Sequence, residues 1–219
     1  MTYSIFIDGE AGTTGLQIRE RLESREDIRL IQLDPALRKE ASARRDAFAE
    51  ADVGILCLPD EAAREAVSLT ADLGVRLIDA STAHRVDDRW VFGFPELNAD
   101  TRSQIADARY VSNPGCYATG SIAIIAPLVA AGLIAEDEAV SINAVSGYTG
   151  GGKALIAEYD DEGAPAHFIY GLNQRHKHIP EIMIYGGLGV QPVFAPSVGR
   201  FAQGMAVQVP LHLDGDRTA

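Results

Sequence analysis

The chain has 219 residues, 47% apolar and 23% charged, which is enough for one large domain or two small ones with a buried core. Its net charge of −12 argues against nucleic-acid binding through a broad basic face, although it is compatible with a local basic pocket for a phosphate. Two cysteines make no disulfide framework, the start lacks a basic leader, and no apolar run reaches the roughly 20 residues that span a bilayer, so we expect an acidic globular protein of a reducing compartment.

The first half of the chain alternates short apolar runs with amphipathic segments. The apolar runs predict strands at residues 3–8, 28–34, 52–59 and 75–82. Residues 16–24 and 60–74 have helical spacing, and the second of these segments starts with acidic residues and ends at a glycine. Strands and helices that alternate at this spacing indicate parallel crossovers. We expect an α/β fold with a doubly wound parallel sheet that is covered on both faces.

The pattern changes after about residue 112. Residues 118–132 are helical in character, with Pro127 expected to kink or shift the helix. Strands are expected at 139–147, 192–201 and 205–213. Because the Pro-Gly turn at 114–115 marks the change, we place a first domain at 1–112 and a second, α+β domain at 113–219.

A glycine-rich loop follows the first strand. Gly9, Gly12 and Gly15 are spaced G-x-x-G-x-x-G and lead into a helix. Glycines let the backbone turn tightly and approach a pyrophosphate, which the helix N-terminus binds through its N–H groups. Thr13 and Thr14 add hydroxyl donors. The loop predicts a Rossmann-type dinucleotide site, with an ordinary βα turn as the alternative.

The sequence after the second strand leaves the identity of the nucleotide open. Asp34 stands where an acidic residue binds the ribose 2′-hydroxyl of NAD. Arg38 and Lys39 follow it and suit the 2′-phosphate of NADP, but they are also ordinary surface residues.

Cys116 follows a Pro-Gly turn and precedes a helical run. At the first turn of a helix, the dipole and the N–H groups favour a thiolate, which attacks acyl carbonyls. The alternative is an inert buried cysteine, which fits Cys57 in its apolar strand better than Cys116 among polar neighbours.

Residues 170–182 supply candidates for acid–base chemistry. Tyr170, His176, His178 and Glu181 lie close together there, and a histidine with a carboxylate is a familiar acid–base arrangement. A surface pair of histidines is the alternative. Two histidines without a third ligand make a poor zinc site, so no metal is expected.

Several residues suit an anionic substrate, although each of them alone fits a plain loop. Ser146 and Lys153 flank a glycine-rich loop, and Arg85 follows a predicted strand at its carboxyl end. Asn113, directly before the Pro-Gly turn, is the remaining candidate for substrate binding.

Seven motifs together resemble one family. They are IDGEAGTTGLQIRERL, ILCLPD, IDASTAHR, SNPGCYATG, NAVSGYTGGGK, RHKHIPEI and PSVGRFAQGM, in chain order. The chain resembles N-acetyl-gamma-glutamyl-phosphate reductase of the shorter bacterial type, a relative of aspartate-semialdehyde dehydrogenase.

The resemblance implies roles for the catalytic candidates. Cys116 matches the nucleophile, which forms a thioester with N-acetylglutamyl phosphate. His176 matches the acid/base, Tyr170 and Glu181 match residues that position it, and His178 is the second choice for its role.

The resemblance also implies NADP as the cofactor. Gly12, Thr13, Thr14 and Gly15 match the pyrophosphate loop, and the family's preference assigns Arg38 and Lys39 to the 2′-phosphate. Arg85 and Lys153 are matched to the carboxylate or phosphate of the substrate.

A cytoplasmic homo-oligomer of arginine biosynthesis is implied, whose partner is its small-molecule substrate. The alternatives are activity on aspartyl phosphate and an inactive remnant that binds NADP. Family members continue beyond this chain with further strands and a glycine-rich segment, so we expect an incomplete second domain.

Overall fold

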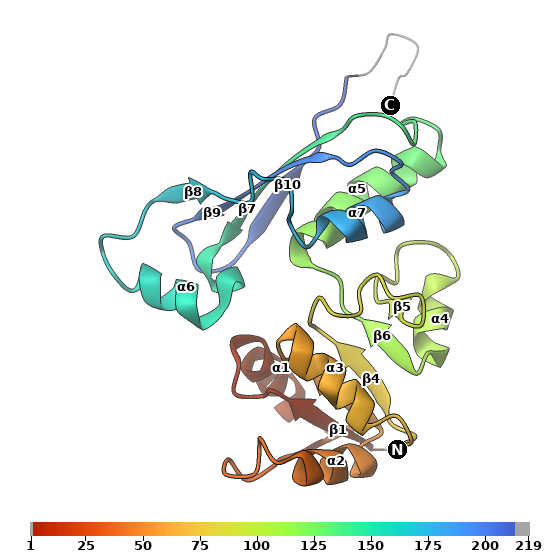
Figure 1. Cartoon of the computed structure of the whole chain (residues 1–219), viewed down its shortest axis with the longest axis vertical. Helices are drawn as coiled ribbons and strands as arrows, with labels where there is room; N and C mark the ends of the chain where they lie inside the picture. The colour runs from red at the N-terminus through yellow and green to blue at the C-terminus, as the bar shows by residue number, and fades with distance from the viewer. Residues whose placement is uncertain (1, 213–219) are drawn as a thin grey trace. The chain divides into compact units, whose positions relative to one another are not determined.

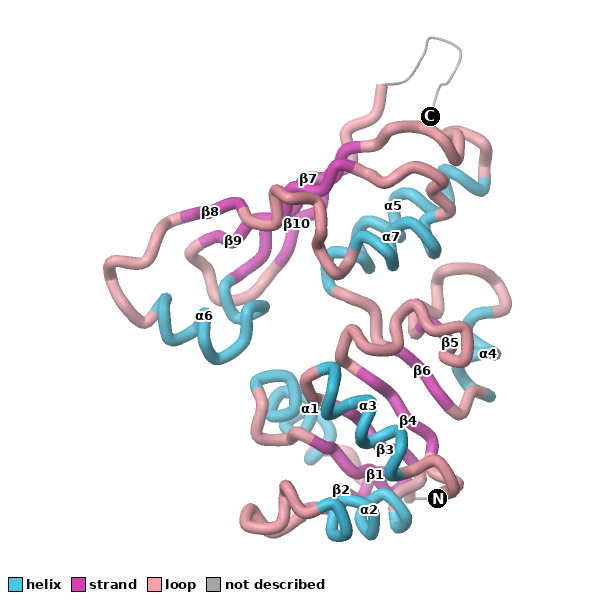
Figure 2. The backbone as a smooth tube through the Cα atoms, viewed as in Figure 1, coloured by secondary structure: helices cyan, strands magenta, loops and turns pink. Residues whose placement is uncertain are grey.

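A computed structural model describes residues 2–212, except the side chain of Thr13, as two compact units (Figures 1 and 2). The first unit comprises the described residues up to Pro95 together with Asp100–Asn113, and the second comprises Glu96–Ala99 and the described residues from Pro114 on. Each unit has its own sheet.

The first unit contains a parallel six-stranded sheet in the order β2-β1-β3-β4-β6-β5. The strands are β1 (Tyr3–Asp8), β2 (Ile28–Ile31), β3 (Val53–Leu56), β4 (Arg76–Asp79), β5 (Val91–Phe92) and β6 (Tyr110–Ser112). The helices are α1 (Thr13–Glu23), α2 (Ala41–Glu50), α3 (Asp60–Leu69) and α4 (Thr101–Asp107).

Apolar side chains are buried on both faces of this sheet. Alternate residues of a strand point to opposite faces, and in β1 Phe6 belongs to one core cluster while Ile5 and Ile7 belong to another. The first cluster includes Phe48 of α2, whose ring meets Phe6 edge-on at 4.9 Å, and the second packs against Ile18 of α1. The predicted α/β fold with a covered parallel sheet is confirmed.

The second unit contains a mixed four-stranded sheet in the order β10-β7-β9-β8, in which only the β7–β9 pair is parallel among the described pairs. Its strands are β7 (Ser141–Gly147), β8 (His167–Ile169), β9 (Val193–Gly199) and β10 (Met205–Gln208). Its helices are α5 (Cys116–Ala130), α6 (Gly152–Tyr159) and α7 (Ile179–Gly186), with a short 3-10 helix η1 (Tyr148–Gly151).

Helix α5 packs closely on this sheet. Gly120 lets it approach β10, because a Cβ at Gly120 would lie 2.8 Å from a methyl of Val207. The helix also runs through Pro127, where we expected a kink or shift. Its last turn is closed by the N–H of Ala131, which donates to the Pro127 carbonyl at 3.0 Å.

Across residues 2–212, no helix combines the length and the hydropathy needed to cross a membrane.

Candidate active site

The glycine loop of the first unit has no room for side chains at two positions. Gly9 has a φ of +88°, and a Cβ there would lie 2.3 Å from the Cys57 carbonyl oxygen. A Cβ at Gly15 would lie 2.5 Å from the Gly9 carbonyl oxygen. Gly12 donates its N–H to that same oxygen at 2.9 Å and forms the N-cap of α1. The loop therefore turns tightly onto the start of a helix, which is the geometry that a bound pyrophosphate needs.

The polar residues that were predicted to bind the nucleotide differ in exposure and in their partners. Thr14 is exposed, whereas the side chain of Thr13 lies outside the described part of the structure. Asp34 is exposed and accepts the N–H of Ala36 at 2.9 Å, so it caps its own turn. Lys39 is exposed. Arg38 donates to a carboxylate inside the glycine loop, Glu10, at 2.7 Å. Sequence reasoning did not single out Glu10.

A buried ion pair holds the last residue of β1, directly before the glycine loop. Arg44 of α2 donates through Nε and Nη2 to one carboxylate oxygen of Asp8, at 3.0 and 2.9 Å. Burial raises the pKa of Asp8, and the hydrogen bond and charge of Arg44 partly oppose this shift. Because Asp8 directly precedes Gly9, the pair anchors the loop to the body of the sheet.

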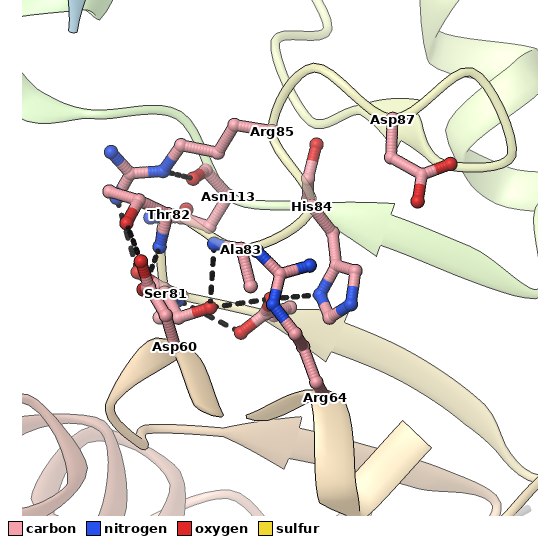
Figure 3. A network of polar contacts seen from close by, with 12 residues as sticks. Asp60, Arg64, Ser81, Thr82, Ala83, His84, Arg85, Asp87 and Asn113 are labelled. Atoms are coloured by element: carbon pink, nitrogen blue, oxygen red, sulfur yellow. Dashed lines mark hydrogen bonds and ion pairs between the residues drawn. The ribbon is translucent and has the colours of Figure 1, made fainter. Parts of the chain in front are cut away.

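A polar network fills the region after β4 (Figure 3). The Asp79 carboxylate is fully buried and meets Nδ1 of His84 at 2.6 Å, and it also accepts the hydroxyl of Ser81 at 2.7 Å. Asp60, at the start of α3, accepts the backbone N–H and the hydroxyl of Thr82. These bonds hold residues 79–84 as an ordered loop.

Arg85 and Asn113 meet at the edge of this network (Figure 3). Arg85 is 8% exposed and donates to the carbonyl oxygens of Asn113, at 2.9 Å, and Ala80, at 3.1 Å. The N–H of Asn113 donates to the Asp79 carbonyl at 2.7 Å. The structure therefore brings together two of the four residues expected to bind substrate, and Arg85 contacts the backbone just before the Pro-Gly turn.

In the second unit, Cys116 is exposed and is the first residue of α5. Gly115 is its N-cap and donates its N–H to the Glu181 carboxylate at 2.8 Å. Glu181 is 1% exposed, so a buried carboxylate of α7 holds the turn that carries the cysteine. We expected Glu181 to position a histidine. Its carboxylate accepts the Gly115 N–H and so contacts the turn before Cys116. Cys57, in contrast, is half-buried, and burial raises its pKa to about 12.

His176 lies among aromatic rings of the same unit. Its ring centroid is 4.6 Å from that of His178, 5.0 Å from Phe194 and 5.7 Å from Tyr170. Burial, with the charge of Lys177, lowers the pKa of His176 to about 4. Its Nδ1 accepts the backbone N–H of His178 at 3.1 Å, so the geometry assigns the neutral ring its proton on Nε2.

Tyr117, which sequence reasoning treated only as helix, connects the candidate residues. It is 2% exposed, and its hydroxyl contacts the Ser146 hydroxyl at 2.7 Å and the Ser197 carbonyl at 2.8 Å. Tyr170 donates to the same hydroxyl, and burial is the largest cause of the raised pKa values of both tyrosines. The sequence signal that could have identified Tyr117 is its position directly after the candidate nucleophile Cys116. Lys153 is exposed on α6.

Comparisons with known proteins agree along the chain. Residues 14–105 match the family described as semialdehyde dehydrogenase, NAD binding domain, and residues 116–219 match semialdehyde dehydrogenase, dimerisation domain. The chain is 54% identical over 221 residues to N-acetyl-gamma-glutamyl-phosphate reductase of Brucella anthropi, covering 98% of this chain and 71% of the relative. The protein of the same name from Sinorhizobium medicae is 53% identical over 220 residues, with the same coverage.

Solved structures show the same fold at low sequence identity. Aspartate semialdehyde dehydrogenase II from Vibrio cholerae matches with a TM-score of 0.69 at 15% identity, covering 95% of this chain and 74% of that one. Aspartate semialdehyde dehydrogenase with NADP from Candida albicans matches with a TM-score of 0.66 at 12% identity, covering 100% of this chain and 73% of that one.

Proposed function

The chain belongs to the N-acetyl-gamma-glutamyl-phosphate reductase family, and from this membership we propose the reaction that it performs. It reduces N-acetyl-L-glutamyl 5-phosphate to N-acetyl-L-glutamate 5-semialdehyde and phosphate, a step of arginine biosynthesis. The observation that carries the proposal is the placement of Cys116, an exposed thiol on the first residue of the 15-residue helix α5.

Cys116 is the nucleophile of this reaction. Its sulfur forms a bond to the acyl carbon while the bond from that carbon to the phosphate oxygen breaks, which releases phosphate and leaves a thioester. The N-terminal end of α5 favours the negative charge of the thiolate and of the carbonyl oxygen during attack. The Gly115 N–H is bound to Glu181, so the proposed donors to that oxygen are backbone N–H groups of the first turn of α5. One such donor contributes about 3 kcal/mol where it has been measured in other enzymes.

His176 is the acid/base that exchanges a proton with the substrate oxygen. With its lowered pKa the ring is neutral near pH 7, and with Nδ1 bound to the His178 N–H it offers Nε2–H as a donor to the substrate oxygen. To accept a proton at Nδ1, the ring must give up the bond from His178. Tyr170 and Tyr117 pack beside this ring and hold its orientation.

NADP is the cofactor, and the glycine loop fits it. Because Gly9 and Gly15 have no Cβ, the backbone turns tightly at positions where a side chain would clash with it. The turn leads to Gly12 and the start of α1, beside Thr14, where a pyrophosphate would lie. Arg38 and Lys39 would hold the 2′-phosphate. When bound, NADPH supplies the hydride that reduces the acyl group to the aldehyde.

Four residues are proposed to bind the anionic groups of the substrate. They are Arg85, Asn113, Ser146 and Lys153. The contact between Arg85 and Asn113 in the first unit supports the first two. Ser146 lies in β7 and Lys153 on α6 of the second unit.

The chain is proposed to work as a homo-oligomer in the cytoplasm. The match to a dimerisation domain supports association, as do exposed apolar residues of the second unit such as Val193, which is 57% exposed. A reducing compartment suits a catalytic thiol.

Activity on aspartyl phosphate is the rival assignment, and the reverse reaction distinguishes the two. We expect phosphate-dependent reduction of NADP with N-acetylglutamate semialdehyde, and at least tenfold less with aspartate semialdehyde. Cys116→Ser should abolish the rate, whereas Cys57→Ser should keep most of it. A faster rate with aspartate semialdehyde would favour aspartyl phosphate as the substrate. Binding of NADP without turnover of either semialdehyde would show an inactive chain.

A further inference from the structure

A carboxylate lies inside the glycine loop itself. Glu10 follows Gly9 and is 8% exposed. One of its oxygens accepts a hydrogen bond from Nη2 of Arg38 at 2.7 Å, and the other lies 3.6 Å from Nη1 of Arg19. A largely buried negative charge therefore faces two guanidinium groups in the loop that is proposed to bind phosphates.

The Glu10–Arg38 pair connects the loops that follow two neighbouring strands. β1 and β2 are adjacent and parallel, so their carboxyl ends lie at the same edge of the sheet. In dinucleotide-binding sheets the phosphates lie over the loop after the first strand, and the adenosine ribose lies at the end of the second. The pair thus spans the region between the pyrophosphate and the ribose 2′-position.

Arg38 keeps bonding capacity for a second anion. Its Nε is buried and has no hydrogen-bond partner among the described residues, while 36% of its side chain is exposed. A guanidinium binds phosphate through two parallel N–H donors. In this conformation the Glu10 carboxylate occupies one end of that fork.

We propose that Glu10 is an internal competitor for the 2′-phosphate of NADP and so determines how strongly the site prefers NADP to NAD. This inference rests on the proposed use of NADP. A 2′-phosphate dianion competes with the carboxylate for Arg38, whereas the 2′-hydroxyl of NAD carries no charge to do so. Glu10 holds the guanidinium at the ribose position and lowers the affinity for NADP.

Two ligands that lack nicotinamide test this role directly. The affinities of the full chain for 2′,5′-ADP and for 5′-AMP are measured by calorimetry at fixed salt, and their ratio reports the 2′-phosphate contact. The unchanged protein should prefer 2′,5′-ADP. Glu10→Gln should raise the ratio about three- to tenfold, the size expected for one partly exposed ion pair. An unchanged or lower ratio would overturn the proposal.

Two further variants isolate the contact with Arg38. Glu23→Gln removes the same charge from α1, where Glu23 pairs with Arg19 at 2.6 Å, and should leave the ratio unchanged. In an Arg38→Met background, Glu10→Gln should lose its effect on the ratio. An equal rise in Glu23→Gln, or a rise that persists without Arg38, would reject Glu10 as the competitor.

The proposed cofactor and the proposed competitor fail in different ways. If the unchanged protein binds 2′,5′-ADP no better than 5′-AMP, the NADP assignment fails and the role of Glu10 fails with it. If the preference exists and Arg38→Met removes it while Glu10→Gln leaves it unaltered, only the role of Glu10 fails.

Discussion

The two thiols of this chain occupy opposite environments. Cys57 ends a strand-like apolar run, is half-buried, and has a pKa raised to about 12 by burial and by the nearby carboxylates of Asp79 and Asp8. Cys116 is exposed at the start of α5, where the helix end favours an anion. Reactivity of a thiol follows its thiolate fraction and its access to reagent.

We therefore expect iodoacetamide to alkylate Cys116 at least tenfold faster than Cys57 at pH 7. Peptide mass spectrometry at timed intervals measures both rates in the same sample. Denatured protein provides the control, because there the two cysteines should react at similar rates. Equal rates in the folded protein would contradict an activated Cys116.

His176 should make stability depend on pH. Its pKa of about 4 lies below the usual value near 6.5, so between these pH values the unfolded chain binds a proton that the folded chain does not. The free energy of unfolding should fall as the pH drops from 6.5 toward 4. His176→Asn should reduce this slope when urea unfolding is followed at pH 7.0 and pH 4.5.

His167, which is exposed, supplies the matched control for that measurement. His167→Asn should leave the slope between the two pH values unchanged. A slope that His176→Asn does not alter would show that His176 titrates normally in the folded protein.

At the scale of elements, the glycine loop shows where sequence reasoning was strongest. A strand, a G-x-x-G-x-x-G spacing and a helix predicted a tight turn, and the structure has Gly9 at positive φ against the Cys57 carbonyl. A glycine pattern reports a backbone constraint directly. Glu10, within the same loop, was not singled out, because its hydrogen bond is to Arg38, 28 residues further along the chain.

Gly9→Ala should lower the free energy of unfolding by at least about 2 kcal/mol, because the new Cβ would meet backbone at 2.3 Å in a conformation that alanine avoids. Gly74→Ala is the control, since a Cβ there has nothing within 4 Å. Urea denaturation of both variants makes the comparison. A Gly9→Ala protein as stable as Gly74→Ala would refute the loop geometry.

Helices without a clear apolar period were not predicted. Helix α2 has the sequence ASARRDAFAE, whose only large apolar residue is Phe48. It is held by that ring, which fits over Gly54, and by the buried bond from Arg44 to Asp8. Both partners lie on strands, so the stabilising contacts are tertiary and invisible in a local window.

At the scale of the molecule, some of the contacts that each unit makes within itself could be predicted and others could not. The Pro-Gly turn predicted Cys116 at a helix start, and residue types within residues 170–182 singled out His176, because turns and residue types are local signals. The bond between Glu181 and the Gly115 N–H joins residues 66 positions apart, and the Tyr117 hydroxyl joins α5 to β7 and β9. Such contacts depend on the packing of elements and could not be derived from spacing.

The second unit should mediate self-association. Val193 of β9 is 57% exposed, and Val193→Asp should shift the chain toward monomer in sedimentation experiments if this part of the sheet is covered by a second copy. Leu37→Asp, at an exposed apolar residue of the first unit, is the control and should not change the mass distribution. If the unchanged chain, Val193→Asp and Leu37→Asp all had the same mass distribution, the interface would not include Val193.

In the proposed reaction, Cys116 carries the acyl group. The direct measurement is intact mass spectrometry of the chain after incubation with N-acetylglutamyl phosphate in the absence of NADPH, followed by peptide mapping at low pH. We predict a mass increase of one N-acetylglutamyl group on the peptide that contains Cys116, lost on treatment with hydroxylamine and absent from Cys116→Ser. An unmodified Cys116 in a chain that still catalyses phosphate-dependent reduction of NADP would contradict the account.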